Sequence, residues 1–327
     1  MKLFQQNFDN FYSSIYGERW MNIRQAMLLP HKQVRRLNPF AFGRDNDSHP
    51  LRSESNKNIS YNSSNDPLVQ KESLEIVSNV EASPWRIPPS CVWNESSEEI
   101  PRGWNQLLTY YVQDPASVMV AENLQVQPGE KVLDLCAAPG GKSLVLAQAL
   151  FSSPNPLSEL ILNEPSPDRR ERLKKVVQQY LSTDVRPQVW VRGKDGMKWG
   201  LEVKNHFDAI LVDAPCSGEG HLIQNEKELK VWKIQRTQSL AQKQYALLCS
   251  AWMSLKPEGR LMYSTCALSP LENDGVIEKF LNKKSGVRLG QIPYRLEKVE
   301  TTKYGQIYLP DQCGFGPMYL CLLIKSP

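Results

Sequence analysis

The pattern of apolar and polar residues predicts helices near the N-terminus and a different arrangement further along the chain. Aromatic and aliphatic residues between Phe4 and Tyr16 recur at steps of three and four, which places them on one face of a helix. A second helix is expected from Trp20 to Leu29, where Pro30 stops it. From about residue 106, short apolar runs separated by amphipathic stretches predict strands that alternate with helices.

The alternating part contains six predicted strands, at residues 131–136, 159–162, 188–191, 207–212, 259–264 and 318–325. Helices are expected in the gaps, at residues 143–151, 168–181 and 238–255. A further helix should start at a capping box, with Ser269 as the N-cap and Glu272 reaching back to it. This order predicts an α/β fold, with a doubly wound, mostly parallel Rossmann-like sheet and a small helical N-terminal region.

Composition divides the chain into three predicted regions. Serine and asparagine dominate residues 42–82 and aromatic residues nearly vanish there, which is typical of a flexible linker. The sequence therefore predicts a helical region over 1–41, this linker over 42–82, and one large domain over 83–327.

The bulk composition excludes several classes of protein. Seven cysteines without a CxxC pair argue against a secreted disulfide scaffold and favour reduced thiols in a cytoplasmic compartment. The four histidines lie at no metal-ligand spacing, so no metal site is expected. No apolar run is long enough to span a membrane, and the N-terminus lacks the features of a signal peptide.

The net charge of +4 is compatible with an RNA partner but does not require one. The basic cluster His31, Lys32, Arg35 and Arg36 has two interpretations that the sequence leaves open. It either contacts RNA phosphates or forms an ordinary solvated surface.

A glycine-rich turn follows the first strand of the alternating part. Gly140 and Gly141 let a ligand approach the backbone, and the N–H groups at the start of the next helix suit an electron-rich ligand. Glu164 follows the next strand, where an acidic side chain can bind ribose hydroxyls. Asp195 follows the third strand, where an adenine edge can be read. A nucleoside-like cofactor accounts for these features together.

The same turn has a rival interpretation as the phosphate-binding loop of an ATPase. Residues 141–143 match the end of that motif, and the apolar run that ends at Asp213 resembles the second phosphate-site motif. However, Cys136 occupies the position of the first glycine of a P-loop, and residues 137–139 reduce the flexibility that a triphosphate cradle needs. The cofactor interpretation is therefore preferred.

Two cysteines lie at the ends of neighbouring predicted strands. Cys216 closely follows Asp213 after the fourth strand, and Cys266 follows the fifth strand. Because the carboxyl ends of parallel strands border one crevice, both thiols and the aspartate should face the ligand. A cysteine is ordinarily a small buried hydrophobic residue, but this placement favours a chemical role. A disulfide between the two would be unusual in a reducing compartment.

A thiolate beside a methyl donor suits methylation of a pyrimidine at carbon 5. Carbon 5 of cytosine is too weak a nucleophile to take a methyl group directly, but a thiolate that adds to C6 converts the ring into an enamine. The addition is favoured when a carboxyl group protonates or hydrogen bonds N3. The C5 proton must then leave and the enzyme–base bond must break, and a second cysteine can assist this release.

These motifs together resemble those of the Sun-domain (RsmB/RsmF-like) RNA cytosine-C5 methyltransferases. The resemblance rests on residues 134–142, 213–220 and 263–266, and residues 113–117 match the segment that precedes the first strand in that family. It covers about residues 106–325. It implies S-adenosylmethionine as cofactor and RNA as substrate, with ribosomal RNA of the small subunit as the first expectation and transfer RNA as the second.

The resemblance also assigns roles to individual residues. Cys266 would be the nucleophile, and Cys216 would assist product release. Asp213 would contact N3 of the cytosine, and Lys142 would help to position it. The residues that would bind S-adenosylmethionine are Cys136, Ala137, Ala138, Pro139, Gly140, Gly141, Lys142, Glu164, Arg169, Asp195, Asp213 and Pro215. DNA cytosine methyltransferases use the other cysteine as nucleophile, but the cysteine at 266 and the absence of a large target-recognition domain favour the RNA group.

Some features depart from the family pattern. Glu164 stands where the family usually has aspartate, and the extra methylene should be tolerated with a small shift. The N-terminal region does not look like the common RNA-binding domain of the family. It resembles the short helical leader of the organellar-type members, and residues 316–319 also resemble the ending of those members. A monomer is expected, and a helper protein is not identified. The alternative from another function class is an RNA-binding assembly factor without turnover, which the presence of both cysteines and Asp213 disfavours.

Overall fold

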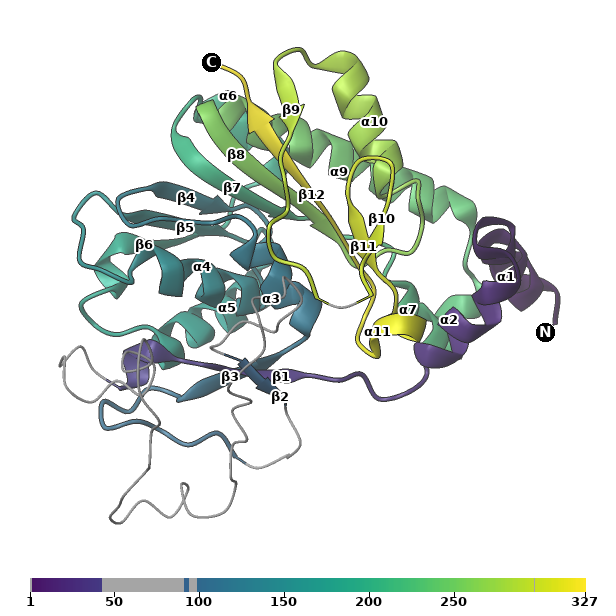
Figure 1. Cartoon of the computed structure of the whole chain (residues 1–327), viewed down its shortest axis with the longest axis horizontal. Coiled ribbons are helices and arrows are strands. Elements are labelled where there is room, and N and C mark those ends of the chain that lie inside the picture. Colours follow the sequence, from purple (N-terminus) through teal and green to yellow (C-terminus); the bar gives the residue numbers. More distant parts are fainter. Residues whose placement is uncertain (1, 43–90, 94–98, 297) are drawn as a thin grey trace.

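The computed structural model describes residues 2–42, 91–93, 99–296 and 298–327. A mixed sheet forms its centre (Figure 1). Along the chain, its strands are β4 (Lys131–Asp134), β5 (Glu159–Asn163), β6 (Val189–Arg192), β7 (Phe207–Asp213), β8 (Leu255–Thr265), β9 (Val287–Leu289), β10 (Glu300–Thr301), β11 (Gln306–Tyr308) and β12 (Met318–Lys325).

The order of the strands confirms the predicted doubly wound sheet. The sheet reads β10-β11-β12-β8-β7-β4-β5-β6, with β9 paired to β12. Strands β8, β7, β4, β5 and β6 are parallel, whereas β12 and the strands beyond it are antiparallel. The strand order reverses next to β4, so the carboxyl ends of β4, β5 and β7 border the crevice where ligands bind in such folds.

Helices cover both faces of this sheet. They are α3 (Pro115–Glu122), α4 (Gly141–Leu150), α5 (Pro167–Tyr180), α6 (Trp199–Glu202), α7 (Glu219–Gln224), α8 (Glu226–Lys230), α9 (Ile234–Ser254), α10 (Asp274–Lys283) and α11 (Pro310–Cys313), with 3-10 turns η3 (Arg186–Gln188) and η4 (Gly196–Lys198). None of the described helices is long and apolar enough to cross a membrane.

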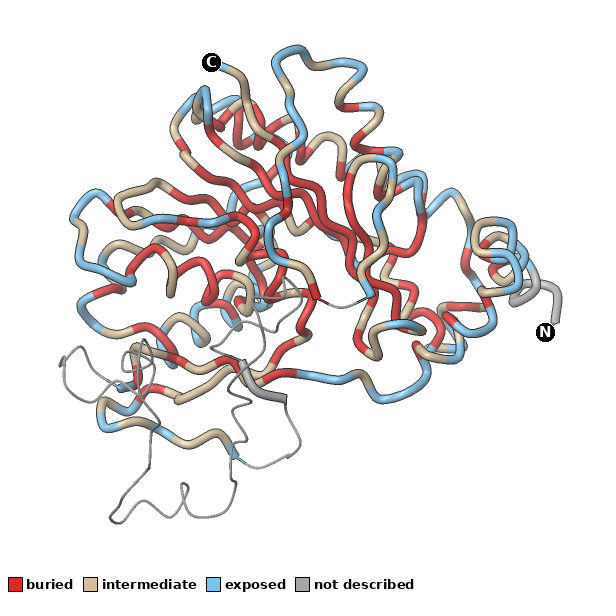
Figure 2. The backbone as a smooth tube through the Cα atoms, viewed as in Figure 1, coloured by how far each residue is buried: buried red, intermediate tan, exposed pale blue. Residues whose placement is uncertain are grey.

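Side chains of the parallel strands alternate between two hydrophobic clusters, one on each face of the sheet. Leu133 and Ile210 belong to the cluster that contains residues of α6, α9 and α10. Val132 and Leu211 belong to the other cluster, with residues of α3, α4 and α5. Because both faces are covered, the inner strands β4, β5 and β7 are largely apolar runs in the sequence, and Figure 2 shows them mostly buried.

The two helices expected near the N-terminus are present as α1 (Lys2–Tyr16) and α2 (Trp20–Ala26), joined by the turn η1 (Gly17–Arg19). Phe8, Tyr12 and Trp20 are completely buried. They belong to the same hydrophobic cluster as α9 and α10, so the N-terminal helices pack into the main core.

The helical region predicted over 1–41 is wrong for its last part, where β1 (Val34–Leu37) is followed by the turn η2 (Pro39–Ala41). Strand β1 pairs antiparallel with β2 (Cys91–Trp93) and β3 (Tyr110–Gln113), and these partners, distant in the sequence, decide its conformation. The rest of the predicted linker, residues 43–82, lies outside the described residues, and the domain boundaries stay predictions.

Two members of the basic cluster, Arg35 and Arg36, lie in strand β1 and have different environments. Arg36 is only 6% exposed. Its guanidinium lies 2.7 Å from a carboxylate oxygen of Glu122 and donates to Gln148 Oε1 at 2.6 Å. Arg35 instead stacks over the ring of Tyr110. Arg36 therefore stabilises the fold and does not face solvent as an RNA-binding residue would.

The capping box predicted at Ser269 is also wrong. Helix α10 begins at Asp274, and Ser269 Oγ is buried without a hydrogen-bond partner. Glu272 does not reach back to Ser269, because its carboxyl group bonds to Ser217 and Gln244 in other segments of the fold. Hydrogen bonds to Ser217 and Gln244, which are distant in the sequence, therefore replace the local capping interaction that the motif predicted.

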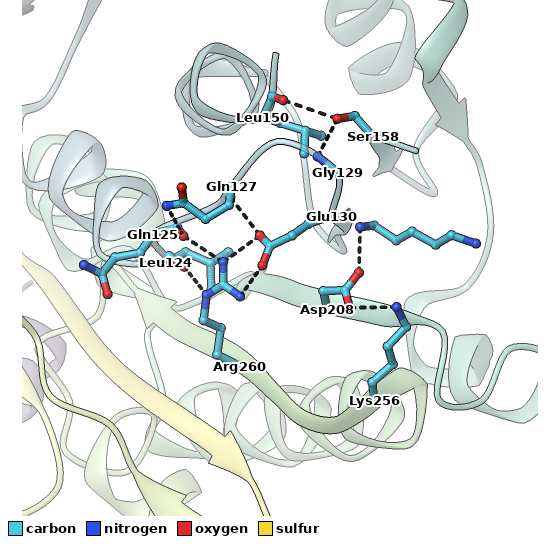
Figure 3. Close-up of polar contacts among 11 residues, drawn as sticks. Leu124, Gln125, Gln127, Gly129, Glu130, Leu150, Ser158, Asp208, Lys256 and Arg260 are labelled. Atoms are coloured by element: carbon cyan, nitrogen blue, oxygen red, sulfur yellow. Dashed lines mark hydrogen bonds and ion pairs between the residues drawn. The ribbon is translucent and has the colours of Figure 1, made fainter. Parts of the chain in front are cut away.

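Charged residues tie the strands together at the end of the sheet opposite the crevice (Figure 3). Arg260 makes two bonds of 2.7 Å to the carboxylate of Glu130 and donates to the carbonyl oxygen of Leu124 at 2.6 Å. Lys256 pairs with Asp208 at 2.6 Å, which joins β8 to β7. These contacts fix the amino ends of the parallel strands, whereas the candidate site lies at the carboxyl ends.

Candidate active site

The turn between β4 and α4 brings the backbone close to strand β3. Gly140 has a φ of +122°, a conformation that favours glycine. A Cβ on Gly141 would lie 2.7 Å from Oε1 of Gln113 and 2.9 Å from the ring of Tyr111. Since the first N–H groups of α4 have no partner within the helix, the turn presents hydrogen-bond donors to a narrow space.

Glu164 follows β5 and is bound to the same turn. Its side chain is buried, accepts a hydrogen bond of 2.9 Å from the N–H of Ser166, and lies 3.3 Å from the guanidinium of Arg169. Arg169 also donates to the carbonyl oxygen of Ala138 at 2.8 Å. Arg169 therefore links the acidic residue to the glycine-rich turn and fixes their relative positions.

Asp195 follows β6 and accepts a hydrogen bond of 3.0 Å from the N–H of Met197. Glu164 and Asp195 both border a small cavity of about 160 Å³. Its apolar lining includes Leu240 and Leu247 from α9. Two acidic groups at the rim of an apolar slot suit a ligand with a flat apolar ring and hydroxyl groups.

Lys142 and Asp213 form an ion pair between the turn and the end of β7. Lys142 Nζ lies 2.9 Å from Asp213 Oδ2, and Ser264 donates to Asp213 Oδ1 at 2.8 Å. Burial lowers the pKa of Lys142, but the charge and hydrogen bond of Asp213 more than offset this, so its pKa lies above the ordinary value. The lysine therefore stays charged and fixes the orientation of the carboxylate.

The two cysteines meet where β7 and β8 end. The Sγ atoms of Cys216 and Cys266 are 2.7 Å apart. The hydrogen bond to Cys266 and burial raise the pKa of Cys216 well above its usual value, so this thiol keeps its proton at neutral pH. Cys266 is the exposed member of the pair, and both cysteines are free.

The thiols face the main cavity of this edge, which has a volume of about 670 Å³. Cys216, Cys266, Asp213 and Lys142 all line it. Two smaller cavities, of about 230 and 160 Å³, share Cys136 with it. Each catalytic or cofactor-binding residue proposed from the sequence lines at least one of the three cavities. The fold thus brings the whole set together, from the carboxyl ends of the five parallel strands β4, β5, β6, β7 and β8.

Sequence reasoning missed two polar side chains of this site. Gln113 is 8% exposed, and neither atom of its amide group has a hydrogen-bond partner. Asp134 Oδ1 is also unpartnered, and burial raises the pKa of this carboxyl group to about 7. Both residues line the cavity of about 230 Å³ beside Gly141. Gln113 stood within the segment 113–117, but no local pattern indicated that its side chain points inward.

Comparison with known proteins places these features in a family context. Residues 121–324 match the sequence profile of the family described as 16S rRNA methyltransferase RsmB/F. The chain is similar to the 5-cytosine rRNA methyltransferase NSUN4 of Mus musculus, with 32% identity over 357 residues that cover 100% of this chain and 89% of the relative. It is also similar to the mitochondrial tRNA (cytosine(34)-C(5))-methyltransferase of Danio rerio, with 32% identity over 97% of this chain and 86% of that protein.

A solved structure of a methyltransferase homolog protein from Pyrococcus horikoshii has a similar fold. It superposes with a TM-score of 0.69 and 23% identity, covering 98% of this chain and 95% of that one.

Proposed function

Because the chain belongs to the 16S rRNA methyltransferase RsmB/F family, we propose that its two neighbouring cysteines perform the family reaction, with Cys266 as the nucleophile. The protein is an S-adenosylmethionine-dependent RNA cytosine-C5 methyltransferase. The observation that carries the assignment of residues is the direct contact between the thiols of Cys216 and Cys266, beside the pair of Lys142 and Asp213. The ATPase and the assembly factor without turnover are therefore not retained.

The residues around the turn fit S-adenosylmethionine, which supplies an electrophilic methyl group when it is bound. Glu164 would bind the ribose hydroxyls, and the apolar cavity beside Asp195 would hold the adenine. The amino-acid end of the cofactor needs donors for its carboxylate and acceptors for its ammonium group. The unpartnered amide of Gln113 and the unpartnered Oδ1 of Asp134, next to the first turn of α4, offer both kinds of group.

The chain's own residues would prepare the cytosine as follows. The thiolate of Cys266 adds to C6, and the electron pair displaced from the C5–C6 bond makes C5 nucleophilic. As the thiolate adds, N3 takes up a proton from solvent, and Asp213 accepts the hydrogen bond of this N3–H group and so stabilises the charge that develops on the ring, while Lys142 holds the carboxylate in place. After methylation the C5 proton passes to water, the C5–H electron pair re-forms the C5–C6 double bond, and the bond between sulfur and C6 breaks with its electron pair returning to Cys266. Cys216, which keeps its proton, lies close enough to Cys266 to assist this release by donating a hydrogen bond to the departing sulfur.

We propose small-subunit ribosomal RNA as the first substrate class and transfer RNA as the second. The relative from Mus musculus carries an rRNA activity in its name and the relative from Danio rerio a tRNA activity, at the same identity of 32%. The match to a family described as acting on 16S rRNA favours ribosomal RNA.

We propose a reducing, cytoplasm-like compartment for the protein. The free cysteines of the catalytic pair support this, because oxidation would remove the nucleophile. The mitochondrial relative from Danio rerio makes an organelle the alternative.

The substrate test is direct. The protein is incubated with methyl-labelled S-adenosylmethionine and with transcripts of small-subunit rRNA or tRNA, and the nucleosides are analysed. We expect 5-methylcytidine in the rRNA. Label in the tRNA alone would contradict the choice of rRNA but leave the reaction intact. Absence of 5-methylcytidine from both RNAs, with cofactor binding retained, would contradict the proposed substrates.

Replacing Gln113 with leucine should weaken cofactor binding, because the shape is kept while both hydrogen-bonding atoms are lost. We expect the Kd for S-adenosylmethionine to rise by about tenfold, the effect of one or two lost hydrogen bonds. Isothermal titration calorimetry measures this without RNA. The matched control is Gln127→Leu, at the opposite end of the sheet, where the glutamine amide donates to the carbonyl oxygen of the nearby Gln125. An unchanged Kd in Gln113→Leu would refute the assignment of this cavity to the amino-acid end of the cofactor.

A further inference from the structure

The backbone ladder between β7 and β8 stops just before the two cysteines. Asp213 is opposite Ser264 in the register, and the N–H of Ala214 donates to the carbonyl oxygen of Ser264 at 2.9 Å. Beyond this point the segments that carry Cys216 and Cys266 leave the sheet. Contacts other than the strand ladder must therefore determine how far apart the two sulfur atoms lie.

Two buried glutamates connect these segments in a crossed manner. Glu219, in the segment of Cys216, accepts a hydrogen bond of 3.0 Å from the N–H of Leu268 in the segment of Cys266. Glu272, beyond Cys266, accepts a hydrogen bond of 3.0 Å from the N–H of Ser217, the neighbour of Cys216. Both glutamate side chains are completely buried. Each cysteine segment is thus held by a carboxyl group that belongs to the other.

The hydrogen-bond count requires one proton on this pair of carboxyl groups. The Oγ of Ser217 contacts an oxygen of Glu219 and an oxygen of Glu272, but a hydroxyl group has a single proton to donate. One of the two carboxyl groups must therefore donate to Ser217 Oγ. Glu219 already accepts from two other donors, the N–H of Leu268 and the hydroxyl of Tyr12. The proton then belongs to Glu272.

The environment of Glu272 agrees with this assignment. Burial and the charge of Glu219 raise the pKa of Glu272 to about 7. Its other oxygen accepts from Ser217 N–H and from the side-chain amide of Gln244 at 2.7 Å. The same amide donates to the carbonyl oxygen of Pro215 at 2.9 Å, so it also holds the residue before Cys216.

Helix α1 supplies the last contacts. The hydroxyl of Tyr12 donates to Glu219, and the hydroxyl of Tyr16 donates to the carbonyl oxygen of Leu268 at 2.7 Å. The ring of Tyr12 stacks on Trp20 at a centroid distance of 4.9 Å, so the side chain is fixed independently of its hydroxyl. Figure 1 shows α1 and α2 on the side of the molecule that carries α7. Both tyrosines lie outside residues 121–324, which match the family profile.

We propose that Glu219 and protonated Glu272 form a crossed clamp that sets the spacing of Cys216 and Cys266, and that Tyr12 of helix α1 is a positioning residue of this clamp. The proposal rests on the proposed function of the two cysteines for its consequence in catalysis. It gives α1 a part in the reaction through a completely buried side chain. It also explains why Glu272 is not available to cap α10.

Linking of the two thiols by diamide measures their spacing without RNA or cofactor. Diamide takes up the two protons and two electrons that the thiols lose, and peptide mass spectrometry quantifies the disulfide between Cys216 and Cys266. We expect Glu219→Gln to slow the linking at least about tenfold, because the reaction depends steeply on thiol placement. Loss of the Glu219 charge would by itself lower the pKa of Cys216 and speed oxidation, so a slower rate reports on spacing.

The linking rate of Glu272→Gln, compared with that of Glu219→Gln, is the decisive measurement. In Glu272→Gln the amide can still donate to Ser217 Oγ and accept from Ser217 N–H, so linking should stay within about twofold of the wild type. Tyr12→Phe, which keeps the ring, should slow linking by a few-fold and lower kcat without changing the Kd for S-adenosylmethionine. Glu130→Gln and Tyr304→Phe are matched controls, since their partners Arg260 and Glu278 lie outside the clamp.

The outcomes separate the clamp from the proposed function. Linking at the wild-type rate in folded Glu219→Gln, or equal losses in Glu219→Gln and Glu272→Gln, would overturn the clamp. If Glu219→Gln does not fold, Tyr12→Phe decides, and an unchanged linking rate and kcat in this variant would refute the role of α1. Slower linking in the clamp variants together with normal methylation by Cys266→Ala would leave the clamp standing and refute the catalytic role of the cysteine.

Discussion

Replacement of Cys266 with alanine is expected to abolish methyl transfer, with kcat lowered by roughly 10⁴-fold or more, as for other enzymes that lose a covalent nucleophile. Without a thiol to add at C6, the cytosine ring keeps its aromatic character and C5 does not attack the methyl group. Binding of S-adenosylmethionine should be unchanged, because the turn at Gly141, Glu164 and Asp195 does not depend on Cys266. Labelled methyl transfer to RNA and calorimetry of cofactor binding measure the two properties separately.

The matched control for this variant is Cys249→Ala, since Cys249 is a free cysteine in α9 that packs against the hydrophobic core and lines none of the three cavities of the site. It should retain kcat close to that of the wild type. Turnover by Cys266→Ala at more than a few per cent of the wild-type rate would show that the residue is not the nucleophile.

Replacement of Cys216 with serine should have a different effect, because addition of Cys266 to the base and methylation are retained, whereas release of the methylated base is slowed. Cys266 still adds to the base, but the group that assists release is changed, and turnover should fall by about 10²-fold or more, the usual contribution of a positioned acid or base. A covalent complex of protein and RNA should accumulate. Denaturing gel electrophoresis with labelled RNA detects this complex.

The double variant Cys216→Ser with Cys266→Ala is the control for this result, and it should form no complex. A single Cys216→Ser variant that turns over like the wild type and leaves no adduct would eliminate the role of Cys216 in release.

The parallel sheet could be predicted from the sequence because its physical cause is local. Strands buried on both faces are apolar runs, and Glu164 follows directly after one of them, while Asp195 lies three residues beyond the edge strand β6. The position of Cys216 and Cys266 followed from the rule that parallel strands present their carboxyl ends to one crevice. The short distance between the two sulfur atoms did not, because contacts beyond the ends of the strands determine it.

The features that the sequence did not predict depend on partners far away in the chain. Strand β1 is only four residues long, and pairing with β2 and β3 decides its conformation. Glu272 matched a capping box, but Ser217 and Gln244 compete successfully for its carboxyl group. Gln113 and Tyr12 gave no local signal at all, since an inward-facing polar group is recognisable only once its surroundings are known.

The most direct test of the central claim is to trap the covalent intermediate and identify its cysteine. RNA with 5-fluorocytidine in place of cytidine is incubated with the wild-type protein and S-adenosylmethionine. Fluorine cannot leave C5 as a proton does, so the methylated base stays bound to the enzyme. Digestion and mass spectrometry should find the modified base on the peptide that contains Cys266. A base attached to Cys216, or methylation without any protein adduct, would contradict the account.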